Sequence, residues 1–450
     1  AWRGTQDCVH CGLCLTHCPT YLTTGVEMSS PRGRIWMMRA LEEGEAALSA
    51  TVVKHLDQCV GCLACAEACP SQVPYAELLE HARVGIETEF SRPPLDRWQR
   101  RLLVGLFPYP RRLGPVLGLL HWYQRLGLAR LVRRSGLLAR LAPRLAGMEA
   151  MLPAVPSAAE RQPLPRLSPA RGPRRATLGL LTGCAQRYLM PELNRATVRV
   201  LTRAGYEVLA PAAQGCCGAL HVHAGDVATA QRLARGLIAV FEGVDLVVAN
   251  AGGCGAAMKD YGRLLRDDPA WRDRAEAFSR RVRDVSEVLA ATEWDGALRP
   301  LDLTVTYHDA CHLAHAQGIR REPRALLARI PGLRLVELPE ADVCCGSGGV
   351  YNVLQPGMAE RILDRKIARI RETGAPVVAA GNLGCLLQIR AGLLRAGLPV
   401  TAVHPVEILD CALSGRNLRG QGLTAQSSGN TSAKFEGRGG AVWRGENQSI

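Results

Sequence analysis

The sequence predicts an α+β and α/β protein, in which a small helical N-terminal module is followed by two pseudo-repeated α/β halves. Three observations predict this organisation. Two matching four-cysteine runs lie within the first 70 residues, and a second set of cysteines recurs later at nearly constant intervals. Around that second set, short apolar segments alternate with amphipathic ones, as strands and helices do in α/β folds. With 450 residues the chain is long enough for about three domains.

The two N-terminal runs share the pattern C-x2-C-x2-C-x3-C-P, at residues 8–19 and 59–70. This spacing is typical of proteins that hold two [4Fe–4S] clusters, where three cysteines of one run bind one cluster and the fourth reaches the other. The sequence therefore predicts two [4Fe–4S] clusters in a ferredoxin-like module over residues 1–90. The predicted ligand sets are Cys8, Cys11, Cys14 and Cys69 for one cluster, and Cys59, Cys62, Cys65 and Cys18 for the other.

Zinc and disulfide bonds are the alternatives for these cysteines. Zinc usually takes cysteines as two C-x2-C pairs, whereas here two four-cysteine runs repeat in register. A disulfide framework would accompany an export signal, and none is visible in the sequence. Electron transfer is the predicted activity.

Composition and charge limit the partners. The net charge is +14, with 55 Lys and Arg against 41 Asp and Glu, which favours acidic partners or an anionic membrane surface. No RNA-binding or recognition-helix motif accompanies this charge, so no nucleic-acid partner is expected. The longest uncharged stretch of the hydrophobic middle region, residues 113–124, falls short of the ~20 residues that a transmembrane helix needs. We expect a protein that is not integral to the membrane.

Two helices are predicted in the N-terminal module. Ser30 can cap a helix whose first residue is Pro31. Arg32 and Arg34 on this helix either offset the charge of the clusters and thiolates or lie on the surface. A second helix, from Tyr75 to about Phe90, is expected to pack against the second cluster loop.

Residues 91–175 are predicted to form a basic helical region and a Pro-rich linker. Around residues 125–134, leucine and valine alternate with arginine, which indicates a basic amphipathic helix. Such a helix suits a membrane surface or an acidic groove, or it packs on its own neighbours. Residues 152–175 show no periodicity and are predicted to be linker.

The second repeat carries a Cys-Cys-Gly turn in each copy, and the copies are predicted to form cysteine-rich (CCG) domains over residues 176–298 and 299–412. The first cysteine precedes the pair by 32 and 33 residues, and the last follows the pair by 37 and 40. All of these cysteines are candidate ligands of a metal or a further cluster. They are Cys184, Cys216, Cys217 and Cys254 in the first copy, and Cys311, Cys344, Cys345 and Cys385 in the second.

The cysteines of each copy are predicted to follow the ends of strands. The predicted strands are 177–181, 207–210 and 245–249, then 303–307, 333–338 and 376–380; the predicted helices are 191–204, 227–241, 322–329 and 359–372. Ligands gather beyond the carboxyl ends of parallel strands, so the four cysteines of a copy are expected to converge. His308 and His312 flank Cys311 and are either site residues or hydrogen-bonded structural residues. Residues 413–450 are polar and are predicted to be a disordered tail.

Together with Ser-Pro-Arg-Gly-Arg at residues 30–34, these motifs make the chain resemble the iron–sulfur subunit of glycolate oxidase (glycolate dehydrogenase) over residues 5–412. The resemblance implies a membrane-associated bacterial complex with two FAD-binding subunits, on which glycolate is oxidised to glyoxylate. Electrons then pass through this chain towards the quinone pool. It also implies a cytoplasmic location, peripheral on the inner face of the cell membrane. No G-x-G-x-x-G motif opens a helix after a strand here, so FAD is expected on the partner subunits only.

The CCG copies differ from a related pattern at one position, which leaves their role undecided from the sequence. Related heterodisulfide reductase subunits close their cysteine set with C-x2-C, whereas Ala257 and Gln388 stand three residues after Cys254 and Cys385. A further cluster, a quinone site and a structural role are the alternatives. The equivalent subunit of a lactate or anaerobic glycerol-3-phosphate dehydrogenase, a heterodisulfide-reductase-like subunit, and a cluster-bearing binding or sensor protein are the competing functions.

Overall fold

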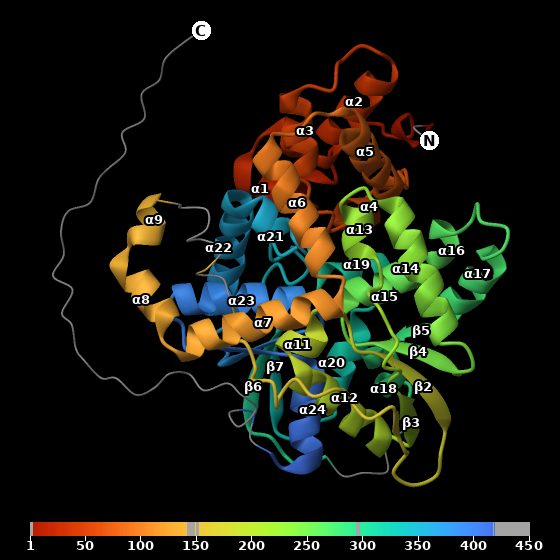
Figure 1. Cartoon of the computed structure of the whole chain (residues 1–450), viewed down its shortest axis with the longest axis vertical. Coiled ribbons are helices and arrows are strands. Elements are labelled where there is room, and N and C mark those ends of the chain that lie inside the picture. Colours follow the sequence, from red (N-terminus) through yellow and green to blue (C-terminus); the bar gives the residue numbers. More distant parts are fainter. Residues whose placement is uncertain (1–2, 142–148, 150–152, 294–297, 417, 419–450) are drawn as a thin grey trace.

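The computed structural model describes residues 3–141, 149, 153–293, 298–416 and 418. It has an N-terminal helical module, a helical connection and two α/β halves (Figure 1). The module contacts both halves. Its helix α5 (Tyr75–Glu89) meets α13 (Ala219–His223) of the first half. Its helices α1 (Pro19–Thr24) and α4 (Ala64–Glu67) meet α22 (Pro356–Glu372) and α19 (Cys311–Gln317) of the second. The mixed fold, helical at the N-terminus and then repeated α/β, confirms the predicted fold class. The predicted tail lies almost entirely outside the described residues.

The N-terminal module consists of short helices joined by the two cysteine loops. Ser30 Oγ accepts a hydrogen bond from the backbone N of Gly33 at 3.0 Å and caps α2, whose first residue is Pro31. Both predicted helices of the module are present. The helices are α1 (Pro19–Thr24), α2 (Pro31–Glu42), α3 (Ala50–Asp57), α4 (Ala64–Glu67) and α5 (Tyr75–Glu89), with 3₁₀ turns η1 (Arg3–Thr5), η2 (Leu15–His17) and η3 (Glu27–Ser29).

The connection is helical, as its composition predicts. Its helices are α6 (Pro94–Leu106), α7 (Pro110–Arg125), α8 (Leu128–Ser135) and α9 (Leu137–Leu141). Helix α8 is the predicted basic amphipathic helix, although its leucines at 128 and 131 are exposed rather than packed on neighbours. Within the predicted linker over 152–175, a short strand β1 (Leu167–Ser168) pairs antiparallel with β3 (Tyr206–Leu209). A strand of two residues leaves no periodicity to detect.

Apart from β1 at the edge of the first sheet, the two halves have the same strand order. The first has β1-β3-β2-β4-β5 and the second β7-β6-β8-β9, and all strand pairs other than β1·β3 are parallel. The strands are β2 (Ala176–Leu181), β3 (Tyr206–Leu209), β4 (Leu246–Ala249), β5 (Val282–Asp284), β6 (Leu303–His308), β7 (Leu333–Val336), β8 (Val377–Ala380) and β9 (Thr401–Val403). The six predicted strands are present, and the three-residue strands β5 and β9 extend each sheet beyond them.

Helices cover and join the sheets. In the first half they are α11 (Gln186–Leu189), α12 (Pro191–Arg203), α13 (Ala219–His223), α14 (Val227–Val240), α15 (Gly252–Lys259), α16 (Tyr261–Leu264), α17 (Arg272–Arg281) and α18 (Val285–Ala290). In the second half they are α19 (Cys311–Gln317), α20 (Arg321–Ala328), α21 (Tyr351–Leu354), α22 (Pro356–Glu372), α23 (Leu383–Arg395) and α24 (Pro405–Ser414). The four helices predicted in the halves correspond to α12, α14, α20 and α22.

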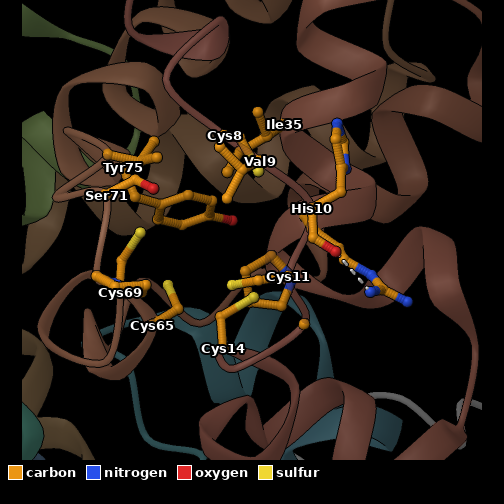
Figure 2. Close-up of a pocket in the computed structure, with 15 residues that line it drawn as sticks. Cys8, Val9, His10, Cys11, Cys14, Ile35, Cys65, Cys69, Ser71 and Tyr75 are labelled. Carbon is orange, nitrogen blue, oxygen red and sulfur yellow. Dashed lines mark hydrogen bonds between the residues drawn. The ribbon is translucent and has the colours of Figure 1, made fainter.

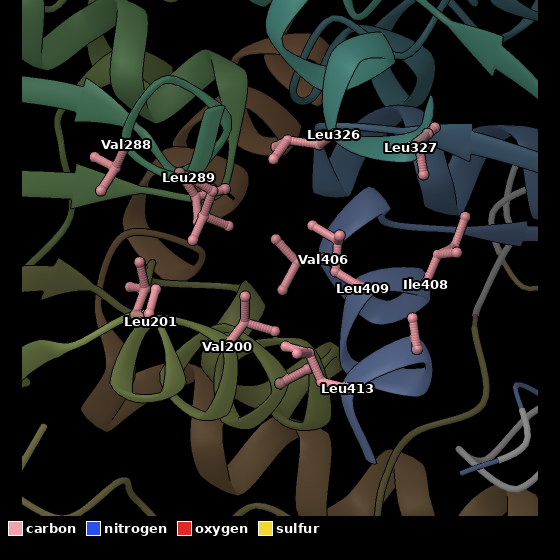
Figure 3. Packing of buried hydrophobic residues seen from close by; sticks show 14 of the residues in the cluster. Val200, Leu201, Val288, Leu289, Leu326, Leu327, Val406, Ile408, Leu409 and Leu413 are labelled. Carbon is pink, nitrogen blue, oxygen red and sulfur yellow. The ribbon is translucent and has the colours of Figure 1, made fainter. Parts of the chain in front are cut away.

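One continuous apolar core joins the halves. Helices α12 and α18 of the first half pack against α20 and α24 of the second, and Figure 3 shows their leucine and valine side chains meeting. Arg199 on α12 also donates to Asp410 on α24, with Nη2 to Oδ2 at 2.7 Å. Because the halves share a core, they hold both cysteine sets in fixed positions.

Candidate iron–sulfur and metal centres

The two N-terminal cysteine loops share a backbone shape as well as a sequence. In the first loop His10 and Gly12 have positive φ, and in the second Gly61 and Leu63, at the same distances from Cys8 and Cys59, do too. Left-handed residues at these two places turn each loop tightly, and glycine supplies one of them without a steric penalty. Each loop thereby directs several cysteines to one side.

The first predicted ligand set lines one pocket. Cys8, Cys11, Cys14 and Cys69 surround it together with Cys65, and Figure 2 shows their sulfur atoms turned towards the space between the two loops. Cysteines from both runs therefore line this pocket, and the assignment of Cys69 rather than Cys65 to the first set stays a prediction. Burial raises the pKa of the Cys14 thiol to about 11 when no metal holds the thiolate. A set of thiol donors around one pocket fits an iron–sulfur cluster.

The second predicted set is more deeply buried. Cys18, Cys59, Cys62 and Cys65 are each at most 9% exposed. Burial raises the pKa of Cys65 far above its usual value, and the nearby thiols of Cys62, Cys59 and Cys18 raise it further. Thiols affect one another's pKa in this way only when they lie close together. A cluster that all four bind requires this arrangement.

Positive groups offset this thiolate charge. Arg34 is 1% exposed, and it donates from Nη2 to Thr20 Oγ1 at 3.0 Å and from Nη1 to Cys18 Sγ at 3.9 Å. Burial alone would raise the pKa of Cys59, but the guanidinium groups of Arg34 and Arg83 outweigh it and lower that pKa. Of the two arginines weighed from the sequence, Arg34 faces the second thiol set. Arg32 pairs with Glu27, lines the pocket of the first set and donates from Nη1 to the carbonyl of His10 at 3.0 Å.

Two residues beside this set were missed by the sequence reasoning. Tyr75 Oη lies 3.4 Å from Cys59 Sγ, and Arg83 Nη2 donates to the carbonyl of Cys59 at 2.8 Å. They stand eight residues apart on α5, on the side that meets the second loop. The sequence did predict that this helix packs against the second cluster loop. Its 3.6-residue period could then have indicated that Tyr75 and Arg83 lie on the side that faces the loop.

In the first CCG copy, the four cysteines follow the carboxyl ends of β2, β3 and β4, as predicted. Cys184, Cys216 and Cys217 are buried and Cys254 is part-buried. Hydrogen bonds from the thiols of Cys216 and Cys254 lower the pKa of Cys217 well below its usual range. Tyr261 Oη donates to the carbonyl of Cys217 at 2.8 Å and holds the turn. The structure therefore brings this set together.

The second copy brings its cysteines together too. The Sγ atoms of Cys344 and Cys311 are 4.0 Å apart. One nitrogen of His308 and the Sγ atoms of Cys345 and Cys385 all lie within 4.8 Å of one another. His312 Nδ1 lies 3.5 Å from Cys311 Sγ. Ala257 and Gln388 offer no thiol, and the buried Gln388 accepts a hydrogen bond from Asn352 Nδ2 at 2.9 Å instead.

The second N-terminal set lies directly against the second CCG copy. Cys62 belongs to one buried apolar cluster with Cys311 and Cys344. Burial raises the pKa of Cys62 well above its usual range, and Cys311 adds to that effect. Across the same contact Tyr351 Oη donates to the carbonyl of Gln58 at 2.9 Å. The sequence reasoning did not anticipate this contact, because it joins residues far apart in the chain.

The fold and these thiol sets define an iron–sulfur electron-transfer protein with two cysteine-rich domains. Three family models agree with that class. Residues 4–73 match a 4Fe-4S dicluster domain, residues 178–259 and 305–390 match a cysteine-rich domain, and residues 95–152 match the linker region of the glycolate oxidase iron–sulfur subunit.

Relatives cover nearly the whole chain. It is 41% identical over 412 residues to a probable glycolate oxidase iron–sulfur subunit of Bacillus subtilis, covering 90% of this chain and 93% of the relative. It is 33% identical over 415 residues to the glycolate oxidase iron–sulfur subunit of Escherichia coli, covering 91% and 94%. The chain belongs to the glycolate oxidase iron–sulfur subunit family, which confirms the resemblance stated from the motifs.

Two further likenesses are partial. Lactate utilization protein A of Bacillus pumilus is 33% identical over 235 residues, which are 51% of this chain and 98% of that protein. A crystal structure of a hypothetical protein from Helicobacter pylori covers 94% of this chain and 75% of that one with a TM-score of 0.54 at 11% identity, and shows a shared fold. Among the described residues, no helix has both the length and the apolar character needed to cross a membrane.

Proposed function

We propose that this chain is the electron-transfer subunit of a membrane-associated glycolate dehydrogenase. It receives electrons from two FAD-binding partner subunits, on which glycolate is oxidised to glyoxylate, and passes them towards the quinone pool. The observation that carries the proposal is the pair of facing thiol sets in a chain whose helical connection matches the family's linker region.

In this proposal Cys8, Cys11, Cys14 and Cys69 hold one [4Fe–4S] cluster, and Cys59, Cys62, Cys65 and Cys18 hold the other. A bound cluster changes its charge by one electron, so two of them suit a flavin that gives up two electrons. Residues 1–90 form the cluster module, residues 91–175 the connection, and residues 176–298 and 299–412 the two CCG domains.

The chain's own residues give the relay a direction. Cys11 is exposed, and its loop neighbours Val9 and Leu13 are 68% and 56% exposed, so the first set faces an incoming partner. The second set is buried and lies against the second CCG copy through Cys62. We propose that electrons enter at the first set and leave through the second.

The connection supplies the proposed membrane contact. Leucines at 119, 126 and 131 and Trp122 are exposed on α7 and α8 and the turn between them, beside the arginines of α8. An exposed apolar stripe beside basic residues suits the interface of an anionic membrane. A peripheral position on the cytoplasmic face of the cell membrane follows from this proposal.

Lactate is the second candidate substrate of the complex, because lactate utilization protein A resembles the chain over about half its length. The linker match and the coverage of both glycolate oxidase subunits favour glycolate. The missing fifth thiols at Ala257 and Gln388 disfavour the heterodisulfide-reductase-like alternative.

The test is substrate-dependent reduction by the purified complex. We expect glycolate to reduce a quinone analogue faster than lactate does. Cys14→Ser and Cys65→Ser are each expected to abolish quinone-linked activity while substrate still bleaches the flavin of the partner. Cys411→Ser is the matched control, because Cys411 is buried on α24 away from both sets.

Two results would contradict the proposal. Quinone-linked activity that survives either cysteine change would remove the relay role from these sets. A complex that oxidises lactate but not glycolate would contradict the proposed substrate, while the proposed electron-transfer role would stand.

A further inference from the structure

The two CCG copies differ at one equivalent position. His308 ends β6 three residues before Cys311, and Leu181 ends β2 three residues before Cys184. Both occupy the same place in their sheets, where His308 pairs with Ala380 on β8 and Leu181 with Ala249 on β4. The second copy therefore has an imidazole where the first has only an aliphatic side chain.

The His308 imidazole is fully buried and half partnered. Its exposed fraction is 0%, and its Nδ1 lies 3.1 Å from the carbonyl oxygen of Ala341. A carbonyl only accepts, so Nδ1 carries the hydrogen and Nε2 keeps its lone pair. Nε2 is buried and has no hydrogen-bond partner among the described residues. An unpaired buried acceptor is costly, which makes a missing ligand the natural partner.

The position of the ring points to a metal. A nitrogen of His308 and the Sγ atoms of Cys345 and Cys385 lie within 4.8 Å of one another. Thiolate and imidazole donors on one tetrahedral metal lie about 3.5–3.8 Å apart, so small side-chain movements suffice. A ring nitrogen held by a backbone carbonyl, with the other nitrogen free, is how proteins orient metal-binding histidines.

A neighbouring side chain supports the thiolate form of one donor. Asn382 Nδ2 donates to Cys385 Sγ at 3.5 Å. Hydrogen bonding to a charged form favours that form, so this amide prepares Cys385 to bind a cation.

We propose that the second CCG copy binds one thiophilic metal atom, iron or zinc, through Nε2 of His308 and the thiolates of Cys345 and Cys385. The imidazole supplies a donor in the copy where Gln388 provides no fifth thiolate. Among the described residues of the first copy, where Leu181 takes the equivalent place, no histidine and cysteines form a site of this mixed kind. The inference does not depend on which substrate the complex oxidises.

The first test uses the unaltered full-length chain, purified without oxygen. Iron and zinc are counted per chain, and one metal atom beyond those of the N-terminal module is expected. For iron, protein grown with ¹⁵N-histidine is expected to change the nitrogen coupling in pulsed EPR of the oxidised form, in which a single ferric ion is paramagnetic. For zinc, the absorption edge is expected to show a shell with both nitrogen and sulfur. No additional metal, or a metal with sulfur donors alone, would overturn the proposal.

Variants then assign the donor. His308→Ala is expected to lose the additional metal, and His308→Cys to keep it without the nitrogen signal. His221→Gln is the matched control, because His221 is also buried with an unpartnered Nε2 but has no cysteine pair at that spacing among the described residues. Retention of the nitrogen signal in His308→Cys would overturn the proposal even if His308→Ala fails to fold.

Discussion

A single buried guanidinium shows how residue-level detail decides the properties of the candidate relay. Arg34 donates from Nε to the carbonyl of His55 at 2.8 Å and reaches Thr20 and Cys18 with its other nitrogens. Its positive charge therefore ties α2 to the second thiol set and offsets the negative charge there. Sequence reasoning could not choose between Arg32 and Arg34, since two residues apart on a helix lie on different sides and burial depends on tertiary packing.

Arg34→Gln is predicted to destabilise the module by about 3–5 kcal/mol, because it removes a buried charge that bonds to Cys18 Sγ, the Thr20 hydroxyl and the His55 carbonyl. The reduction potential of the adjacent cluster is predicted to become more negative, since the lost cation no longer favours the added electron. Thermal unfolding and an EPR-monitored redox titration measure the two effects. Arg39→Gln, on the exposed side of the same helix where Arg39 pairs with Glu43, is the control, and equal effects of both changes would refute this role of Arg34.

The grouping of the cysteines, by contrast, could be inferred from the sequence, although the two ligand sets themselves stay predictions. Each N-terminal run carries its own geometry in C-x2-C-x2-C, and the structure lines one pocket with Cys8, Cys11, Cys14 and Cys69. His308 was a candidate from its place beside Cys311, but its free nitrogen depends on the carbonyl of Ala341, 33 residues away.

At the scale of elements, apolar patterns and capping residues predicted the helices and strands whose own sequence favours them. The six longer strands and the capped helix α2 carry their own apolar pattern and cap, so they appear where the sequence places them. Strands β1, β5 and β9 have two or three residues and form because a neighbouring strand offers a free edge. No local pattern of that length can indicate a strand.

Helix α24 illustrates an element whose start depends on protonation. His404 caps it, accepting at Nδ1 from the backbone N of Val406 at 3.2 Å, and Glu407 completes the capping box. Burial lowers the pKa of His404 to about 3. The folded protein therefore holds this ring neutral, whereas the unfolded chain protonates it below a pH of about 6.5.

This cap predicts a loss of stability in acid. As pH falls from about 6.5 towards 3, His404 alone should lower the free energy of unfolding by about 1.4 kcal/mol per pH unit. The reason is that only the unfolded state binds the proton. Urea unfolding midpoints at pH 7 and pH 5.5 measure the slope. His404→Asn keeps a capping oxygen but cannot titrate. The pH dependence of its free energy of unfolding should therefore be smaller by the contribution of one proton. Glu407 titrates in both proteins and cancels in the comparison, and identical slopes would exclude this source.

At the scale of the whole molecule, the decisive feature is the docking of the N-terminal module on both halves. The cysteine repeat predicted two similar halves, but it could not say which half meets which loop. The second loop meets the second half, through Cys62 and through the hydroxyl of Tyr351 on the carbonyl of Gln58. Such a contact is set by surfaces far apart in sequence, which a repeat does not encode.

Tyr351→Phe is predicted to loosen this docking without changing the core. Losing one hydrogen bond and leaving the Gln58 carbonyl unpaired costs about 1 kcal/mol. Amide hydrogen exchange over residues 58–65 should therefore accelerate about fivefold. Tyr261→Phe removes a hydroxyl bonded to Cys217 inside the first half and should leave that loop unchanged. Unaltered exchange in the Tyr351 variant would mean that other contacts hold the module.

The unequal exposure of the two N-terminal thiol sets has a consequence for the order in which bound iron is lost in air. Cys11 is open to solvent, while Cys18, Cys59, Cys62 and Cys65 are buried. Dissolved oxygen and chelators reach a cofactor through solvent, so corrosion starts at the Cys8–Cys14 loop and moves inward. If both proposed clusters are bound, a preparation handled in air passes through a four-iron form before it loses all its iron, so iron per chain reports how far oxidation has gone.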